Sequence, residues 1–182
     1  MKIINEPTIL TNRTRLEEIF RLRCLAWENS PFPNSINFTK YPNGFQDILD
    51  ESSIHFYSTN QKDEIIAAAR LTVLNSLEAL PYPKIFTSFD IWPSERPFLF
   101  YSRLVIHPEY RKQGLKQKFD RIRVKYQLDH LIPFSIATAT IARATDISLY
   151  GFQTIATVTK ETDQLFPFEH RELLLLLKDI KL

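Results

Sequence analysis

Apolar positions along the chain fall into two kinds of block, and each kind predicts a different element. Over residues 14–27 and 114–131, apolar side chains recur about every three to four positions, which is the spacing of an amphipathic helix. The first block opens with Thr14-Arg15-Leu16-Glu17, a capping-box pattern that predicts the start of a helix. Short helices are also expected over 44–51 and 142–150. Continuous or alternating apolar runs predict strands at 54–59, 64–74, 98–106, 134–140, 152–158 and 173–180.

This order of elements predicts one domain, residues 1–182, built on a central sheet. Two helices come first, three strands follow, and helices then alternate with strands. Hairpins combined with a central strand–helix–strand unit predict an α/β (α+β) fold, in which helices flank a sheet of mixed direction. A chain of 182 residues can bury a core of that kind. The Pro- and aromatic-rich stretch 75–97 is expected to be a long functional loop.

The composition argues against several classes of protein, namely nucleic-acid-binding, membrane-spanning, disulfide-linked and metal-binding proteins. A net charge of +2 gives no case for nucleic acid or an anionic membrane surface. The longest apolar run, Leu173 to Leu177, is too short to span a bilayer, and the first residues contain no signal-peptide pattern. The single cysteine, Cys24, excludes an intramolecular disulfide and favours a cytoplasmic setting, and its apolar surroundings predict a core role rather than a nucleophile. The four histidines show no metal-ligand spacing, so no metal is expected.

The run from Leu104 to Lys116 carries the strongest chemical signal. It consists of an apolar strand end, the stop at Pro108, a basic glycine loop around Gly114 and the start of a helix. Such a junction gathers backbone N–H groups at the positive end of a helix dipole, where a phosphate or pyrophosphate binds. The residues expected to hold the pyrophosphate are Arg111, Lys112, Gln113, Gly114, Leu115 and Lys116, and the strand residues that lead into this loop are Leu104, Val105 and Ile106.

The same run resembles the acyl-CoA-binding motif of the GCN5-related N-acetyltransferase superfamily. The family pattern is an apolar strand, Pro, and then Arg/Gln-x-x-Gly-x-Gly/Ala, and this chain has Arg111-x-x-Gly114-x-Lys116, with Lys116 as the departure. The resemblance implies the acyl-CoA N-acyltransferase fold and acetyl-CoA or another acyl-CoA as cosubstrate. It also implies that the backbone of Leu104–Ile106 pairs with the pantetheine arm. The basic residues of the helix that follows spread around it, which favours a solvated helix over a nucleic-acid surface.

A second similarity lies at Leu149-Tyr150-Gly151-Phe152. The family commonly places Leu-Tyr, a short spacer and then Gly-Phe here, and this chain lacks the spacer. In many members that Tyr protonates the departing CoA thiolate, so the resemblance makes Tyr150 the candidate general acid. The alternative is a Tyr that packs its helix against the sheet.

A third set of residues resembles one branch of the superfamily, the autoinducer (acyl-homoserine lactone) synthases. The matching residues lie in the order that the branch shows, although Tyr101 replaces its acidic residue before Ser-Arg. They are Arg23, Trp27, Asp47, Asp50, Arg70-Leu71 and Tyr101-Ser102-Arg103-Leu104. Arginines inside apolar strands need an acidic partner or an anionic ligand. We therefore predict that Arg70 and Arg103 bind the acceptor and that at least one reaches Asp47 or Asp50, beside the cleft opposite the CoA loop. A solvated helix face is the alternative for the two aspartates.

The resemblance implies an N-acyltransferase that moves an acyl group, with acetyl expected, from CoA to a small-molecule amine by direct attack. One alternative is a long-chain N-acyl amino acid or acyl-homoserine lactone type synthase, whose acyl tunnel the many Phe residues would line. Another is a non-catalytic CoA-binding sensor, because the strand 98–106 contains no general base. Glu95, Asp90, His107 or a water relay stay open as the base. The acyl carrier, the acceptor and a homodimer also stay open.

Overall fold

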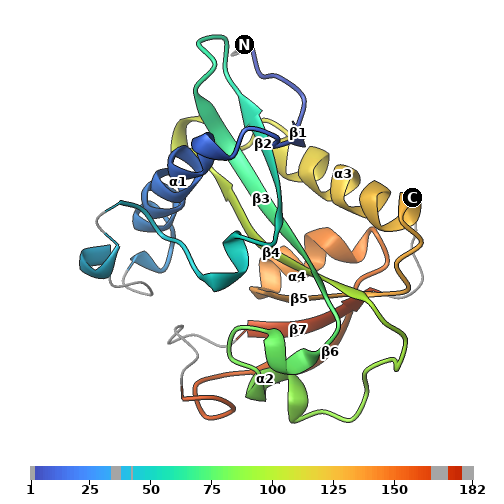
Figure 1. The fold of residues 1–182 in the computed structure, drawn as a ribbon. Coiled ribbons are helices and arrows are strands. Elements are labelled where there is room, and N and C mark those ends of the chain that lie inside the picture. The colour runs from blue at the N-terminus through green and yellow to red at the C-terminus, as the bar shows by residue number, and fades with distance from the viewer. Residues whose placement is uncertain (1–2, 34–37, 42, 165–171, 178–182) are drawn as a thin grey trace. The chain divides into compact units, whose positions relative to one another are not determined.

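The computed structural model describes residues 3–33, 38–41, 43–164 and 172–177, and in them it forms a seven-stranded sheet with the order β1-β2-β3-β4-β5-β7-β6 (Figure 1). The strands are β1 (Thr8–Ile9), β2 (Ile54–Thr59), β3 (Ile65–Leu74), β4 (Phe98–Ile106), β5 (Ser135–Ala139), β6 (Gln153–Val158) and β7 (Glu172–Leu177). The helices are α1 (Leu16–Glu28), α2 (Lys84–Thr87), α3 (Leu115–Asp129) and α4 (Ile141–Ser148). Most strand pairs are antiparallel and β4–β5 is parallel, so the predicted fold class, a mixed sheet flanked by helices, is confirmed.

The chain divides into two compact units. The first combines Met1–Thr72 with Ser102–Arg123, and the second combines Val73–Tyr101 with Val124–Leu182. Strands β3 and β4 and helix α3 therefore each contribute residues to both units. The single domain expected from the sequence stays a prediction.

In the first unit, α1 packs its apolar face on the sheet. Ile19 and Leu22 of α1 belong to one buried cluster with Ile65 and Ala68 of β3 and Val105 of β4. Strand β2 pairs with β3 as a long antiparallel hairpin, which Figure 1 shows. Because β3 is buried over nearly its whole length, its sequence is a continuous apolar run rather than an alternating one.

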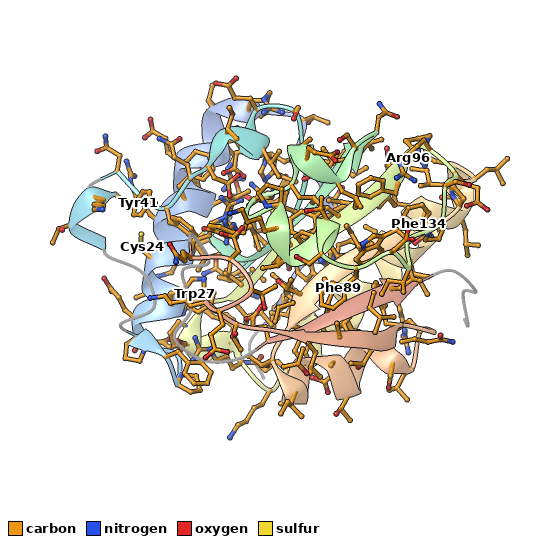
Figure 2. The ribbon with its side chains drawn as sticks, turned by 90° about the horizontal axis from the view of Figure 1, so that it is seen from below. Cys24, Trp27, Tyr41, Phe89, Arg96 and Phe134 are labelled. Carbon is orange, nitrogen blue, oxygen red and sulfur yellow. The ribbon has the colours of Figure 1, made fainter. Side chains whose placement is uncertain are left out.

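In the second unit, aromatic rings form much of the core. The rings of Phe98 and Phe134 stack with centroids 5.2 Å apart. The guanidinium of Arg96 lies 5.7 Å from the centroid of the Phe134 ring. Figure 2 labels both side chains. Strand β7 lies between β5 and β6 and is antiparallel to both. It is therefore inserted between two strands that precede it in the sequence. The expected strand 173–180 is confirmed as far as Leu177, and residues 178–180 lie outside the described residues.

Two predictions about the first unit were wrong. Helix α1 begins at Leu16, without a side-chain cap, because Asn12 instead caps a preceding 3-10 turn by accepting a hydrogen bond from the Thr14 N–H. The expected helix over 44–51 is only a 3-10 turn at Ile48–Asp50.

The stretch 75–97 also differs from the expected loop, because it contains α2 and a 3-10 turn at Leu77–Ala79. The indole N–H of Trp92 donates to the Phe86 carbonyl at 2.8 Å, which ties the stretch to its own short helix. The two-residue strand β1 gave no signal in the sequence, because two residues are too few to show a period.

Candidate active site

The loop between β4 and α3, residues 107–114, has the backbone conformation that its sequence predicted. The ring Nδ1 of His107 accepts a hydrogen bond from the Glu109 N–H at 3.3 Å and caps the 3-10 turn Pro108–Tyr110. The backbone then becomes extended at Arg111, and α3 starts four positions later at Leu115. We call residues 107–114 the phosphate loop.

Gly114 leaves open space at the start of α3. Its φ of +77° is a conformation that L side chains rarely adopt, and a Cβ placed on it meets no atom within 4 Å. Lys112 also has a positive φ, of 61°, and is exposed. Leu115, at 1% exposure, anchors the first turn of α3 in the core. The first N–H groups of a helix have no partner within it, so this turn offers donors and a positive dipole end to an anion.

The side chain of Arg111 points to a different place from the one expected. Its guanidinium donates to the carbonyl of Ala26 at 2.9 Å and to the carbonyl of Asn29 at 2.5 Å, both at the C-terminal end of α1. Its Nε lies 3.4 Å from the carbonyl of Ile106, the last residue of β4. The sequence therefore located the loop, but it could not reveal that α1 supplies acceptors for this side chain.

The backbone of strand β4 becomes irregular at Arg103. Its parallel pairing with β5 covers Leu99 to Tyr101, while β5 itself continues to Ala139. Arg103 has a φ of 55°, which is uncommon for a residue inside a strand and is strained for one with a side chain. The part of β4 expected to meet the pantetheine arm, Leu104–Ile106, follows this irregular residue directly.

Five charged side chains in the first unit form one network, which we call the arginine–aspartate cluster. Arg23 of α1 makes two 2.8 Å contacts to the carboxylate of Asp50. Nη1 of Arg70 contacts both Asp47, at 2.5 Å, and Asp50, at 2.9 Å. Arg103 contacts Asp47 at 2.6 Å. The predicted ion pairs between these arginines and aspartates are confirmed, and the alternative of a solvated helix face for the aspartates is wrong. Their position beside a cleft stays a prediction.

The turn that holds the two aspartates is shaped by local hydrogen bonds and by a glycine. Asp47 accepts from the Leu49 N–H at 3.1 Å, and Asp50 accepts from the Asp47 N–H at 2.8 Å, a reciprocal capping box. The N–H of Phe45 donates to the Phe20 carbonyl of α1 at 3.0 Å. A Cβ on the preceding Gly44 would lie 2.5 Å from the Phe20 carbonyl carbon, so only glycine lets the turn approach α1 this closely.

Two residues of this region, Phe45 and His55, gave no signal in the sequence, whereas Ser102 entered only as part of the run 101–104. The ring of Phe45 lies 4.5 Å from the Arg103 guanidinium, which is cation–π range. The hydroxyl of Ser102 accepts from Arg70 Nε at 3.0 Å. Nε2 of His55 donates to the Asp50 carbonyl at 3.0 Å, since a carbonyl only accepts.

Electrostatics keeps both carboxylates of the cluster ionised. Burial opposes the charge of Asp47 and Asp50, but the ionic contacts with the arginines outweigh it and hold the pKa of each below its usual range. Burial lowers the pKa of His55, and Arg23 and Arg70 add repulsion, so its neutral form is favoured. Burial also lowers the pKa of Arg23 against the attraction of Asp50.

The cluster meets solvent at one end. The side chains of Arg70 and Asp50 are 0% and 4% exposed, whereas those of Arg103 and Asp47 are 13% and 21% exposed. The Arg103–Asp47 pair is thus the part of the cluster that a ligand can reach. The buried Arg23 and Arg70 contact the two aspartates from the interior and hold their carboxylates in place.

Tyr150 lies in the turn after α4, in the second unit. Its N–H donates to the Ile147 carbonyl at 3.0 Å, and Gly151 follows with a φ of +102°. The ring of Phe152 packs edge-on against Tyr101 at 5.2 Å. The role of Tyr150 as a general acid stays a prediction.

The remaining candidates have simpler explanations. The Cys24 thiol is half-buried on α1, where Figure 2 labels it, and burial raises its pKa, which disfavours a nucleophilic thiolate.

Within residues 3–33, 38–41, 43–164 and 172–177, no three His, Cys, Asp or Glu side chains gather into a group that could hold a metal. None of the helices in that part of the chain is both long and apolar enough to cross a membrane.

Several solved acyltransferases have structures similar to that of this chain. FeeM, an N-acyl amino acid synthase from uncultured soil microbes, aligns with 98% of this chain and 92% of its own, at 15% identity and a TM-score of 0.72. BjaI, a CoA-dependent acyl-homoserine lactone synthase, aligns with 97% of this chain and 82% of its own, at 16% identity and a TM-score of 0.67. The ribosomal-protein-S18-alanine N-acetyltransferase from Escherichia coli aligns with 97% of this chain and 93% of its own, at 15% identity and a TM-score of 0.57.

A scan against models of protein families finds no match, and a search of curated protein sequences finds none either. The solved structures nevertheless define the class of fold: this chain has the acyl-CoA N-acyltransferase fold. The resemblance to the GCN5-related N-acetyltransferase superfamily and to its synthase branch is therefore confirmed at the level of the fold. At identities of 15–16% the likeness shows the fold and does not extend to the reaction.

Proposed function

We propose that this protein is an acyl-CoA-dependent N-acyltransferase that transfers an acyl group from CoA to a small-molecule amine. The observation that carries the proposal is the phosphate loop. Its open glycine, its positive-φ lysine and the start of α3 lie directly after β4, an arrangement that suits an anion, on a fold whose known members include acyltransferases.

In this proposal the backbone holds the cosubstrate. N–H groups from Gly114 to Lys116 bind the pyrophosphate, and the lysine side chains at 112 and 116 add charge nearby. The backbone of Leu104–Ile106, beyond the irregular Arg103, pairs with the pantetheine amides as a strand edge pairs with a peptide. Arg111 contributes by shaping the loop, since its guanidinium is turned to α1.

The reaction is a direct attack. The amine nitrogen forms a bond to the thioester carbonyl carbon and the carbon–sulfur bond breaks. The nitrogen passes its proton to a base, for which Glu95, Asp90, His107 and a water relay stay open. Tyr150 supplies a proton to the leaving thiolate, which suits a phenol beside a developing sulfur anion. The Arg103–Asp47 pair contacts the acceptor, while Arg70 supports it through Asp47.

A second candidate is a synthase that acylates an amino-acid-like acceptor with a longer chain. The arginine–aspartate cluster favours it, because three guanidiniums face only two carboxylates and the excess positive charge suits an acceptor that carries an anionic group. FeeM and BjaI, both synthases, also give higher TM-scores than the acetyltransferase from Escherichia coli. Profiling of acyl-CoA chain length with the purified protein separates the candidates: preference for acetyl-CoA supports the first and preference for medium or long chains supports the second.

The test of the CoA site is Gly114→Glu, compared with Gly114→Ala. The Glu side chain places a carboxylate where the pyrophosphate would lie, so CoA binding measured by calorimetry should fall below detection while circular dichroism stays unchanged. The Ala variant has room for its methyl group and should lose much less affinity. Equal CoA affinity in the wild type and a folded Gly114→Glu protein would rule out this site.

The test of catalysis is Tyr150→Phe, which removes only the hydroxyl. We expect turnover in a thiol-release assay to fall by about a hundred- to ten-thousand-fold, the usual contribution of a general acid, with CoA affinity unchanged. A full-rate variant would return Tyr150 to a packing role. A wild-type protein that binds CoA but shows no turnover across a library of amines would instead favour the non-catalytic sensor.

A further inference from the structure

The guanidinium of Arg111 is committed to the end of a helix rather than to the loop that contains it. Its Nη2, Nη1 and Nε donate to the carbonyls of Ala26, Asn29 and Ile106, at 2.9, 2.5 and 3.4 Å. The first two carbonyls lie in the last turn and C-cap of α1, and the third ends β4. One side chain therefore joins three backbone segments of the first unit.

The last turn of α1 needs such a partner. The final carbonyls of a helix lack partners within the helix, and a positive charge near them is favourable because the C-terminal end of the dipole is negative. The Leu25 carbonyl accepts from the N–H and the side-chain amide of Asn29, and the Trp27 carbonyl accepts from the Ser30 N–H. The carbonyl of Ala26 is satisfied by Arg111.

The loop needs the same contact for its own shape. Directly after Arg111 the backbone enters the left-handed region at Lys112, and it does so again at Gly114. A left-handed residue with a side chain persists only where its surroundings hold it. Fixing Arg111 at three points sets the position from which this turn, and the N–H groups after it, are presented.

We propose that Arg111 is a positioning residue that couples CoA binding at the phosphate loop to the order of the C-terminal turn of α1. This inference rests on the proposed CoA site. Binding at the loop holds Arg111 in place and so stabilises the α1 turn. By linkage, the ordered turn strengthens CoA binding by the same factor. Arg23 lies one turn earlier on α1 and pairs with Asp50, so the helix end that Arg111 holds belongs to the helix that supports the arginine–aspartate cluster.

The experiment compares Arg111→Ala and Arg111→Lys with Lys112→Ala. CoA affinity is measured by calorimetry over a series of sodium chloride concentrations, and amide hydrogen exchange is followed at Asn29 and Ser30 with and without CoA. Lys112→Ala is the matched control, because it removes an exposed cation from the adjacent position.

A positioning role predicts three results. Arg111→Ala weakens CoA binding by roughly 10- to 100-fold with its salt dependence unchanged, whereas Lys112→Ala weakens it less and flattens the salt dependence, because direct charge contacts are screened by salt. CoA slows exchange at Asn29 and Ser30 in the wild type and loses that effect in Arg111→Ala. Arg111→Lys resembles the Ala variant, because an ammonium is a single point and cannot reach three carbonyls as the guanidinium fork does.

Opposite results would overturn the proposal. If Arg111→Lys restored CoA affinity, or if Arg111→Ala flattened the salt dependence while exchange at Asn29 and Ser30 stayed at the wild-type rate, Arg111 would be a direct phosphate ligand. Should Arg111→Ala fail to fold, the Lys variant alone decides between these outcomes. If the wild type bound no CoA, the proposed function and the coupling would both fall. In that case, faster amide exchange at Asn29 and Ser30 in Arg111→Lys than in the wild type would show that Arg111 only stabilises the end of α1.

Discussion

The phosphate loop and the arginine–aspartate cluster lie in the same unit but handle charge in opposite ways. The loop is exposed and offers backbone groups, with glycine keeping the space above them open. The cluster is buried except at its Arg103–Asp47 end, and its carboxylates and guanidiniums form ion pairs with one another. A backbone site tolerates changes in neighbouring side chains, whereas a buried ionic network loses stability when any member is removed. The contrast therefore predicts that loop variants change ligand binding and that cluster variants change stability.

The largest expected effect is that of Asp50→Ala. This change leaves Arg23 without its carboxylate and Arg70 with only Asp47, and removal of one partner from a buried ion pair typically costs about 3–5 kcal/mol. Urea denaturation should show that loss. The control is Asp129→Ala, which breaks an exposed pair with Lys125 and should cost no more than about 0.5 kcal/mol. Equal midpoints for the two variants would mean that the cluster does not support the fold.

A smaller effect is expected from the same substitution at two glycines. Gly44→Ala forces a Cβ to 2.5 Å from the backbone of α1 and retains a φ of +109°, so we expect a loss of about 2–4 kcal/mol. Gly114→Ala meets open space and bears only backbone strain, about 1 kcal/mol. Thermal unfolding of the two variants measures the difference directly. A Gly114 variant as unstable as the Gly44 variant would contradict the view of the loop as an open site.

The most gradual effect is that of acid. Asp47 and Asp50 have folded-state pKa values below their unfolded values, so their contribution is complete above about pH 4 and is lost as the pH falls through the folded values. The lowered pKa of His55 has the same sign and begins to act below about pH 6.5, where the unfolded chain takes up a proton first. A salt-bridged Asp contributes about 2 kcal/mol in this way.

Unfolding curves at several pH values between 7 and 3 would follow this loss. His55→Gln should remove the loss of unfolding free energy that begins near neutral pH. Asp47→Asn should reduce the further loss that appears in stronger acid. CoA affinity of the loop should change little over the upper part of this range. A stability that stayed constant down to pH 3 would show that the carboxylates titrate alike in the folded and unfolded chains.

The sequence predicted the strands and the long helices well because their signals are local. The apolar runs of β2 and β4 matched their observed limits, and α3 differed from its predicted range only at the ends. Predictions based on short polar patterns were weaker. Thr14 and Glu17 matched a capping box, yet Asn12 caps a preceding 3-10 turn and α1 begins without a side-chain cap. The spacing over 44–51 suggested a helix, but Gly44 and the two aspartates hold a tight 3-10 turn.

The sequence by itself determined the phosphate loop, because Pro108, Gly114 and the apolar strand before them are neighbours whose conformations follow from local sterics. It also put Asp47, Asp50, Arg70 and Arg103 forward as candidates through their order. Only the tertiary structure decided which of them meet, since α1, the Asp47–Asp50 turn, β3 and β4 bring the partners together across many residues. It also placed the Arg111 guanidinium on carbonyls at the ends of α1 and β4, and the part of Arg111 in CoA binding stays a prediction. A side chain of that length binds whatever acceptors packing places within its reach, and no local pattern encodes where the end of a distant helix will lie.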